Sequence, residues 1–277
     1  NSPMPDALRP DLDRYFARLG DAGERMPTLA TLARLQAAHL DAIPFENLDV
    51  RLGRPIALDL ASLEAKLVGR RRGGYCFEQN TLFAAVLRAL GFELDTLEAR
   101  VLPPGATSTL PRTHMTLRVR LAEGDHLADV GFGGDGPLAP VPFDGTPVAA
   151  GGETHRLARE TGGIQVLQRR VEGVWTDLYA FSPTPALPID YEVANHFTST
   201  HPRSIFRQTL TAQRATVAGR HLLRGRTYTL RRGDASESRE LYDAGALELL
   251  RGTIGLDVTG EEVRAALAEE GPGPTRT

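Results

Sequence analysis

The sequence of 277 residues contains one cysteine, Cys76, and this scarcity excludes several kinds of protein. A single cysteine cannot form an internal disulfide, so the chain is not a disulfide-stapled secreted domain. One cysteine among histidines at these spacings also gives no zinc pattern, and we expect no metal. The cysteine content therefore indicates a protein of the reducing cytoplasm.

Long apolar runs and an excess of charge are absent too. No apolar stretch approaches the roughly 20 residues that a membrane-spanning helix needs. The first ten residues, NSPMPDALRP, have neither the basic leader nor the apolar centre of a secretory signal, so we expect none. The formal net charge of −3 indicates neither nucleic acid nor an anionic membrane as a partner. The remaining composition, 41% hydrophobic and 24% charged, is typical of a soluble globular protein.

Nucleotide-binding glycine motifs are missing as well. The chain has no Walker-type loop, and the glycine-rich segment GFGGDG, residues 131–136, leads into a proline-rich loop and not into a helix. The consecutive arginines Arg70, Arg71 and Arg72 form a charge run of the kind that usually faces solvent. We therefore expect neither segment to bind a nucleotide.

The period of the apolar residues changes about a third of the way along the chain. Before that point, apolar residues recur at helical spacing and predict helices over residues 28–40, 59–70 and 80–91, the second capped by Asp59 and the third ended by Gly91. After it the period is two, which predicts an antiparallel sheet or small barrel. The expected strands lie at residues 92–101, 114–121, 126–132, 163–171 and 175–181.

The last third of the sequence is mixed. Residues 206–217 and 219–233 have the alternation of a strand pair, and residues 237–252 have the apolar spacing of a helix. A last helix is predicted to begin with a capping box, in which Thr259 is followed three residues later by Glu262.

The cysteine lies in the segment RRRGGYCFEQN, residues 70–80, where two glycines and an aromatic residue lead into a helix-like stretch. Gly73 and Gly74 allow a backbone path without Cβ clashes, which would bring the thiol of Cys76 to a helix N-terminus. There the free N–H groups and the helix dipole stabilise a thiolate, the reactive form of the side chain. The plainer alternative is a small buried hydrophobic residue, and the local sequence leaves both open.

A nucleophilic cysteine needs a general base, and usually a group that orients the base. Seven histidines are candidates, and His114 opens a predicted strand while Asp129 lies on the next one. In a hairpin that turns at Glu123 and Gly124, these two side chains share a face but are offset by about four residues, roughly 13 Å. In this register they would touch only through a bulge, so the pattern alone leaves the pair undecided.

Three motifs together closely resemble those of the arylamine N-acetyltransferases: RRGGYCFEQN, RTHMTLRV and LADVGFGG, in this order. HLDAIPFENLDV at residues 39–50 and NHFTSTHPRSIF at residues 195–206 are similar to further segments of that family. The resemblance implies that Cys76, His114 and Asp129 form a catalytic triad. It also implies that the histidine and the aspartate meet, so that the simple hairpin is too crude.

For the fold, the resemblance implies an α+β multidomain protein with a cysteine-protease-like Cys-His-Asp core. Residues 1–91 would form an N-terminal helical bundle that carries the cysteine, and residues 92–194 a central antiparallel β-barrel that carries the histidine and the aspartate. Residues 195–277 would form a C-terminal α/β lid. The helix and strand pattern described above has the same three-part order.

The implied reaction is the transfer of an acetyl group from acetyl-CoA to the nitrogen of an arylamine or arylhydrazine, in two steps through an acetyl-cysteine. Phe45 and Phe132 match positions that line the family's acceptor pocket, and Thr113 and Gly133 match positions near the thiol arm of CoA. An ordinary core or strand position is the alternative for the aromatic residues and for the threonine. The partners would be acetyl-CoA and the amine, with no metal, nucleic acid or membrane involved.

Three more residues are assigned to structural roles. We expect Arg72 to pair with Glu46 inside the protein and not to bind nucleotide. We expect His39 to be a hydrogen-bonded structural residue, with a second base as the alternative, and His201 to belong to a turn, with a ligand contact as the alternative.

Other functions remain open at this point. An amide synthase of the same family, which closes a macrolactam, would use the same triad in a larger and less enclosed cleft. A cysteine hydrolase would use a Cys-His-Asp triad without any need for CoA. A non-catalytic binding module would have no reason to hold all three groups.

Overall fold

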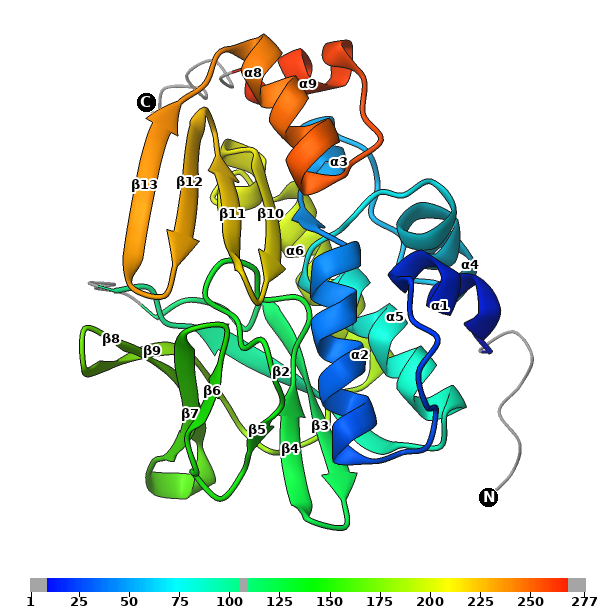
Figure 1. The fold of residues 1–277 in the computed structure, drawn as a ribbon, viewed down its shortest axis with the longest axis vertical. Helices are drawn as coiled ribbons and strands as arrows, with labels where there is room; N and C mark the ends of the chain where they lie inside the picture. The colour runs from blue at the N-terminus through cyan, green and yellow to red at the C-terminus, as the bar shows by residue number, and fades with distance from the viewer. Residues whose placement is uncertain (1–8, 105–108, 269–277) are drawn as a thin grey trace.

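The computed structural model describes residues 9–104 and 109–268, in which helices pack against a barrel-like sheet and a second sheet lies beside both (Figure 1). The segment NSPMPDAL, where we expect no secretory signal, lies outside the described residues. Within the described ranges, no helix combines the length and the apolar character that a membrane crossing requires.

The N-terminal helices are α1 (Leu12–Leu19), α2 (Leu29–Ala42), α3 (Leu48–Arg51), α4 (Leu60–Leu63) with the π-helical turn η2 (Glu64–Gly69), and α5 (Cys76–Ala89). Asp59 caps α4 as predicted, because its carboxylate accepts the amide of Ser62 at 2.9 Å. Gly91, with a φ of 90°, follows the end of α5 as predicted. Helix α5 begins at Cys76, four residues before the predicted start of this helix, so the thiol lies at a helix N-terminus.

The central sheet has eight strands in the order β5-β4-β3-β2-β9-β8-β7-β6, all paired antiparallel, and it curves into a nearly closed barrel. On β3 one face, made of Met115, Leu117 and Val119, packs with the helices, and His114 and Thr116 take the opposite face. The strands are β2 (Glu93–Val101), β3 (His114–Leu121), β4 (Gly124–Ala128), β5 (Val141–Pro142), β6 (Val148–Ala150), β7 (Glu153–Arg159), β8 (Gln165–Val171) and β9 (Val174–Phe181).

The second sheet has five strands in the order β1-β10-β11-β12-β13, and α8 and α9 lie beside it, at the top of Figure 1. Thr259 and Glu262 form the predicted capping box at the start of α9. The elements are β1 (Phe45–Glu46), α6 (Pro188–Thr200), α7 (Ile205–Gln208), β10 (Thr211–Thr216), β11 (Gly219–Arg224), β12 (Thr227–Arg232), β13 (Ala235–Glu240), α8 (Asp243–Glu248), η4 (Leu249–Ile254) and α9 (Gly260–Leu267).

The helix predicted over residues 237–252 is wrong at its start. Residues 237–240 belong to the edge strand β13, which pairs with β12, and α8 begins only at Asp243. Every residue of β13 is exposed, so the strand has no apolar alternation and its backbone pairing leaves no mark in the sequence.

The division of the chain after residues 91 and 194 into three domains stays a prediction. One hydrophobic core includes residues of both α5 and β3, and residue 194 lies within α6. The strand β1 comes from the N-terminal part but pairs with β10 of the second sheet. These connections bring residues from all three parts to one cavity.

Candidate active site

Cys76 is the first residue of α5 and is buried, with 3% of its surface exposed. The chain reaches this helix beside β1, where the amide of Glu46 donates to the carbonyl of Gly74 at 3.0 Å. A Cβ atom at Gly73 would lie 1.9 Å from the carbonyl oxygen of Pro44, so only glycine allows the two segments to approach this closely. The glycine pair therefore brings the thiol to the N-terminus of the helix, as predicted.

Buried ion pairs hold the segment before the cysteine. Arg72 pairs with Glu46 at 2.7 Å, as predicted, and with Asp49 at 3.3 Å. Lys66 bridges Asp49 at 2.8 Å and Glu78 at 2.6 Å. Each buried cation contacts two carboxylates, so every charged group of this cluster has a partner of opposite charge. The cluster ties η2, α3, β1 and α5 together around the glycine pair.

A hydrogen-bond relay holds the same segment from the side of α2. Nε2 of Gln79 donates to the carbonyl oxygens of Pro44 (2.8 Å) and Gly74 (3.2 Å), so its Oε1 accepts Nε2–H of His39 at 2.7 Å. Nδ1 of His39 then accepts the hydroxyl of Tyr15 at 2.7 Å. Burial lowers the pKa of His39 to about 4, so the ring is neutral near pH 7. His39 is a hydrogen-bonded structural residue, as predicted.

His114 and Asp129 meet on one face of the hairpin formed by β3 and β4. Nε2 of His114 donates to Oδ2 of Asp129 at 2.6 Å. The turn predicted at Glu123 and Gly124 is wrong by one residue, because Leu121 pairs with Gly124 and the strands turn at residues 122–123. This shift reduces the offset between the two side chains from four residues to two, which is within reach of a diagonal cross-strand pair. No bulge is needed for the contact.

The carboxylate of Asp129 is surrounded by hydrogen-bond donors. Its Oδ2 also accepts the hydroxyl of Tyr179 at 2.7 Å, and its Oδ1 accepts Nδ2 of Asn80 at 3.0 Å and the amide of Gly131 at 2.8 Å. Burial would raise the pKa of Asp129, but the charge of His114 and these hydrogen bonds lower it. The buried carboxylate is therefore held in its ionised form.

Sequence reasoning missed Asn80 and Tyr179. Asn80 follows Cys76 by four residues and so lies on the same face of α5; this spacing was the available signal. Its side chain links α5 to the barrel, since it also donates to the carbonyl of Met115 at 2.7 Å. Tyr179 comes from β9, and only the strand order of the barrel brings it to Asp129.

The thiol lies beside the imidazole. Sγ of Cys76 donates to the carbonyl oxygen of Thr113, the residue before His114, at 3.5 Å. Burial alone would lower the pKa of His114, but the charge and hydrogen bond of Asp129 and the neighbouring Cys76 side chain raise it to about 10. A histidine with this pKa holds a proton readily, as the acceptor of a proton from a neighbouring thiol must.

A cavity of about 410 Å³ opens onto Cys76 and His114. Its size is within the range of small-molecule sites. The predicted residues Phe45, Phe132 and Thr113 all line it. The other lining residues include Val101, Leu110, Gly131, Phe197, Arg203, Ile205 and Phe206. Apolar and aromatic side chains thus surround the thiol, and Asp129 lies behind His114, outside the cavity.

Gly133 does not line this cavity. It has a φ of 83°, and a Cβ atom there would lie 2.7 Å from Oε1 of Gln213, which accounts for the glycine without any ligand. The predicted contact of Gly133 with the CoA arm stays a prediction. Gly131 is the glycine that lines the cavity, and a Cβ atom there would lie 2.6 Å from Cα of Cys76.

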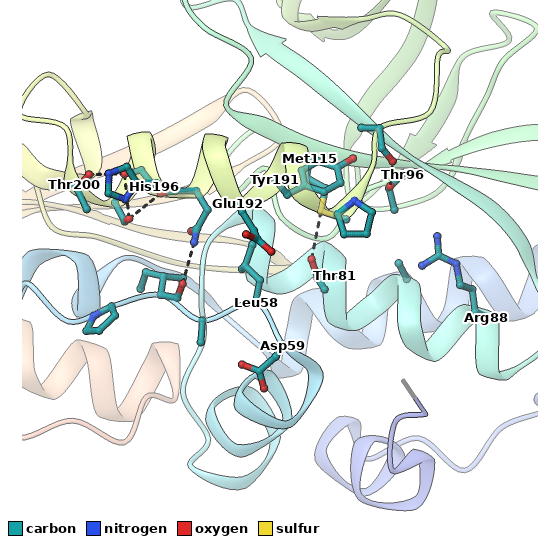
Figure 2. A pocket seen from close by; sticks show the side chains of 18 residues that line it. Leu58, Asp59, Thr81, Arg88, Thr96, Met115, Tyr191, Glu192, His196 and Thr200 are labelled. Carbon is teal, nitrogen blue, oxygen red and sulfur yellow. Dashed lines mark hydrogen bonds between the residues drawn. The ribbon is translucent and has the colours of Figure 1, made fainter. Parts of the chain in front are cut away.

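A larger cleft of about 720 Å³ lies between α5, α6 and the segment before α4 (Figure 2). Thr81, Arg88 and Tyr191 line it, whereas neither Cys76 nor His114 does. Among the residues that the structure describes, no group of three His, Cys, Asp or Glu side chains is placed to hold a metal ion. The smaller cavity is therefore the candidate active site, because Cys76 and His114, the candidate nucleophile and base, both line it.

Comparison with known proteins agrees with this geometry. A family model described as N-acetyltransferase matches residues 28–263. The arylamine N-acetyltransferase of Mycolicibacterium smegmatis is 42% identical over 270 residues, which cover 94% of this chain and 98% of that relative.

Solved structures extend the similarity to the whole fold. That of Mycobacterium marinum arylamine N-acetyltransferase in complex with CoA aligns with a TM-score of 0.87 at 36% identity, covering 93% of this chain and 98% of the other. The structure of the Nocardia farcinica arylamine N-acetyltransferase aligns with a TM-score of 0.87 at 40% identity. The alignment covers 96% of this chain and 98% of the other. The chain therefore belongs to the arylamine N-acetyltransferases, a family of acyltransferase enzymes.

Proposed function

We propose that the protein transfers an acetyl group from acetyl-CoA to the nitrogen of an arylamine or arylhydrazine, through an acetyl-Cys76 intermediate. The observation that carries the proposal is the alignment of a buried thiol, His114 and Asp129 at one end of an apolar cavity. CoA in the complex of the M. marinum relative supports the donor, and the names of the relatives support the acceptor.

In the first step, His114 takes the proton of the thiol and Cys76 attacks the acetyl carbonyl of the donor. Because Nε2 of His114 donates to Asp129, Nδ1 is the nitrogen left to accept that proton. Asp129 fixes this tautomer and stabilises the imidazolium, as the acid of such triads does. The C–S bond to CoA then breaks, and the departing sulfur takes the proton from His114.

The oxyanion of this step would form beside the start of α5. The first amides of a helix have no acceptor within the helix, and Cys76 and Phe77 are its first two residues. Their N–H groups are our candidates for the oxyanion donors, assisted by the helix dipole.

In the second step, the amine attacks the carbonyl carbon of acetyl-Cys76, the C–S bond breaks and the sulfur of Cys76 leaves, and His114 accepts the proton that the nitrogen loses. Water is the competing nucleophile, and it would release acetate without any transfer. The apolar walls of the cavity, including Phe45 and Phe132, favour an aromatic amine over water. A cavity of about 410 Å³ suits a small amine better than the large precursor of a macrolactam.

Initial-rate kinetics test the proposal. Rates measured over a grid of acetyl-CoA and arylamine concentrations should give the parallel double-reciprocal lines of a ping-pong mechanism. Cys76→Ala should abolish CoA release. Intersecting lines would contradict the acetyl-cysteine route, and an amide or ester hydrolysed without CoA would favour a cysteine hydrolase.

A further inference from the structure

Arg203 stands apart from the other residues of the cavity in its charge. Among the described residues that line the cavity, it is the only arginine, lysine, aspartate or glutamate. Arg203 is itself exposed, so it lies at the open side of the cavity, whereas Cys76 and His114 are buried at its inner end. The cavity therefore has a reactive end and a cationic mouth, separated by apolar and aromatic walls.

The backbone of Arg203 is held in a fixed turn between α6 and α7. Nδ1 of His201 accepts the amide of Arg203 at 3.1 Å, and the ring of His201 stacks on Phe197 with 4.5 Å between ring centroids. The hydroxyl of Ser204 donates to the carbonyl of Thr198 at 2.5 Å. His201 thus belongs to a turn, as predicted, and this turn keeps the Arg203 side chain at the mouth of the cavity.

The guanidinium of Arg203 has no acidic partner within the part of the chain that is described. Within the described residues, Arg203 makes one hydrogen bond, through its backbone amide. Its side chain makes no hydrogen bond or ion pair with these residues. Arg112, the residue next to Thr113 of the cavity wall, differs in this respect, because it lies 3.9 Å from Glu98. The five N–H donors of Arg203 remain available to a ligand.

We propose that Arg203 is a specificity-determining residue that binds an anionic group of a substrate at the mouth of the cavity. The inference rests on the function proposed above and names a chemical feature of its substrates. A guanidinium binds carboxylate and phosphate through paired, charge-assisted hydrogen bonds. The anion is either a carboxylate on the ring of the acceptor amine or a phosphate of the CoA donor.

Matched substrates separate these two sources of the anion. For the acceptor, 4-aminobenzoate is compared with 4-aminobenzamide, which has a neutral group of similar shape. For the donor, acetyl-CoA is compared with S-acetyl-N-acetylcysteamine, which has no phosphate. The kinetic constants for each substrate are measured with the wild type, with Arg203→Gln and with the charge-retaining Arg203→Lys. The control is Arg264→Gln on α9, which replaces an exposed arginine outside the cavity.

If the anion belongs to the acceptor, Arg203→Gln lowers kcat/KM for 4-aminobenzoate on the order of tenfold. The value of kcat/KM for 4-aminobenzamide stays unchanged. If it is the donor's, the variant raises KM for acetyl-CoA by a similar factor and leaves the phosphate-free donor unchanged. Arg203→Lys should retain part of the effect, and Arg264→Gln should match the wild type.

The inference is overturned if Arg203→Gln changes neither kcat/KM for 4-aminobenzoate nor KM for acetyl-CoA, while the wild type still acetylates 4-aminobenzamide. Failure of the proposed function looks different, because the wild type would then not acetylate either acceptor.

Discussion

Nε2 of His114 donates to Oδ2 of Asp129 at 2.6 Å, at a position where only 1% of the Asp129 surface is exposed. Tyr179, Asn80 and the amide of Gly131 complete the hydrogen bonds of the carboxylate. A buried carboxylate with this many donors stays ionised and cannot turn away from the imidazole. The pair therefore sets which nitrogen of His114 is left for the thiol.

Asp129→Asn should keep the shape of this site and disturb the tautomer of His114. We expect kcat/KM for acetyl transfer to fall by about 10³-fold or more, as in other triads that lose the acid. The control is Asp125→Asn on β4, since that carboxylate pairs with Arg118 and does not line the cavity. Activity of Asp129→Asn within about tenfold of the wild type would contradict the role given to the carboxylate.

Asn80→Ala should lower both stability and activity. It leaves the amide of Val130 and the carbonyl of Met115 without their partner, in addition to removing a donor to Asp129. We expect the free energy of unfolding, measured with urea, to fall by about 2–4 kcal/mol. Thr81→Ala should cost less than about 1 kcal/mol, because within the described residues the hydroxyl donates only to the sulfur of Met115. Equal losses in the two variants would show that the Asn80 bridge is unimportant.

The stability of the protein should fall at high pH through His114. Its pKa of about 10 in the folded protein lies above the ordinary value of 6.5, so the folded state binds the proton more tightly than the unfolded state. The resulting stabilisation is complete below pH 6.5 and is lost as the pH rises through about 10. Urea unfolding of the wild type and His114→Asn, at about pH 7 and about pH 10, measures it. The difference in the free energy of unfolding between the wild type and His114→Asn should be smaller at the higher pH. A difference that does not change with pH would refute the raised pKa.

His39→Leu should separate structure from chemistry. The variant breaks the relay from Tyr15 to Gln79 and should lower the free energy of unfolding by about 2–4 kcal/mol. Because the pKa of His39 is lowered to about 4, its contribution is present above pH 6.5 and is lost as the pH falls through about 4. The folded variant should still form acetyl-Cys76. A stable variant that is never acetylated would instead make His39 a participant in the reaction.

Local sequence signals were sufficient where one residue determines one feature. Asp59, Gly91 and the pair Thr259 and Glu262 mark helix ends because each makes its contact within its own helix terminus. The glycine pair before Cys76 indicated an unhindered backbone path into the helix, but the approach of Gly73 to the carbonyl oxygen of Pro44 on a distant segment had no local signal.

Features that depend on register or on strand order could not be predicted in this way. Because the turn between β3 and β4 was misplaced by one residue, the expected offset between His114 and Asp129 along the strands was four residues and not the observed two. Tyr179 reaches Asp129 because β9 lies beside β2 in the barrel, an adjacency with no local signal. Gly133 matched a motif, but it does not line the cavity and instead lies beside the side chain of Gln213 from the second sheet.

The central claim is that Cys76 carries the acetyl group between donor and acceptor. Intact-protein mass spectrometry after brief exposure to acetyl-CoA, without any amine, tests it most directly on the wild type and on Cys76→Ala. The account predicts that the wild type gains one acetyl group, that an added arylamine removes it, and that Cys76→Ala gains none. An unlabelled wild type, or equal labelling of the two proteins, would contradict it.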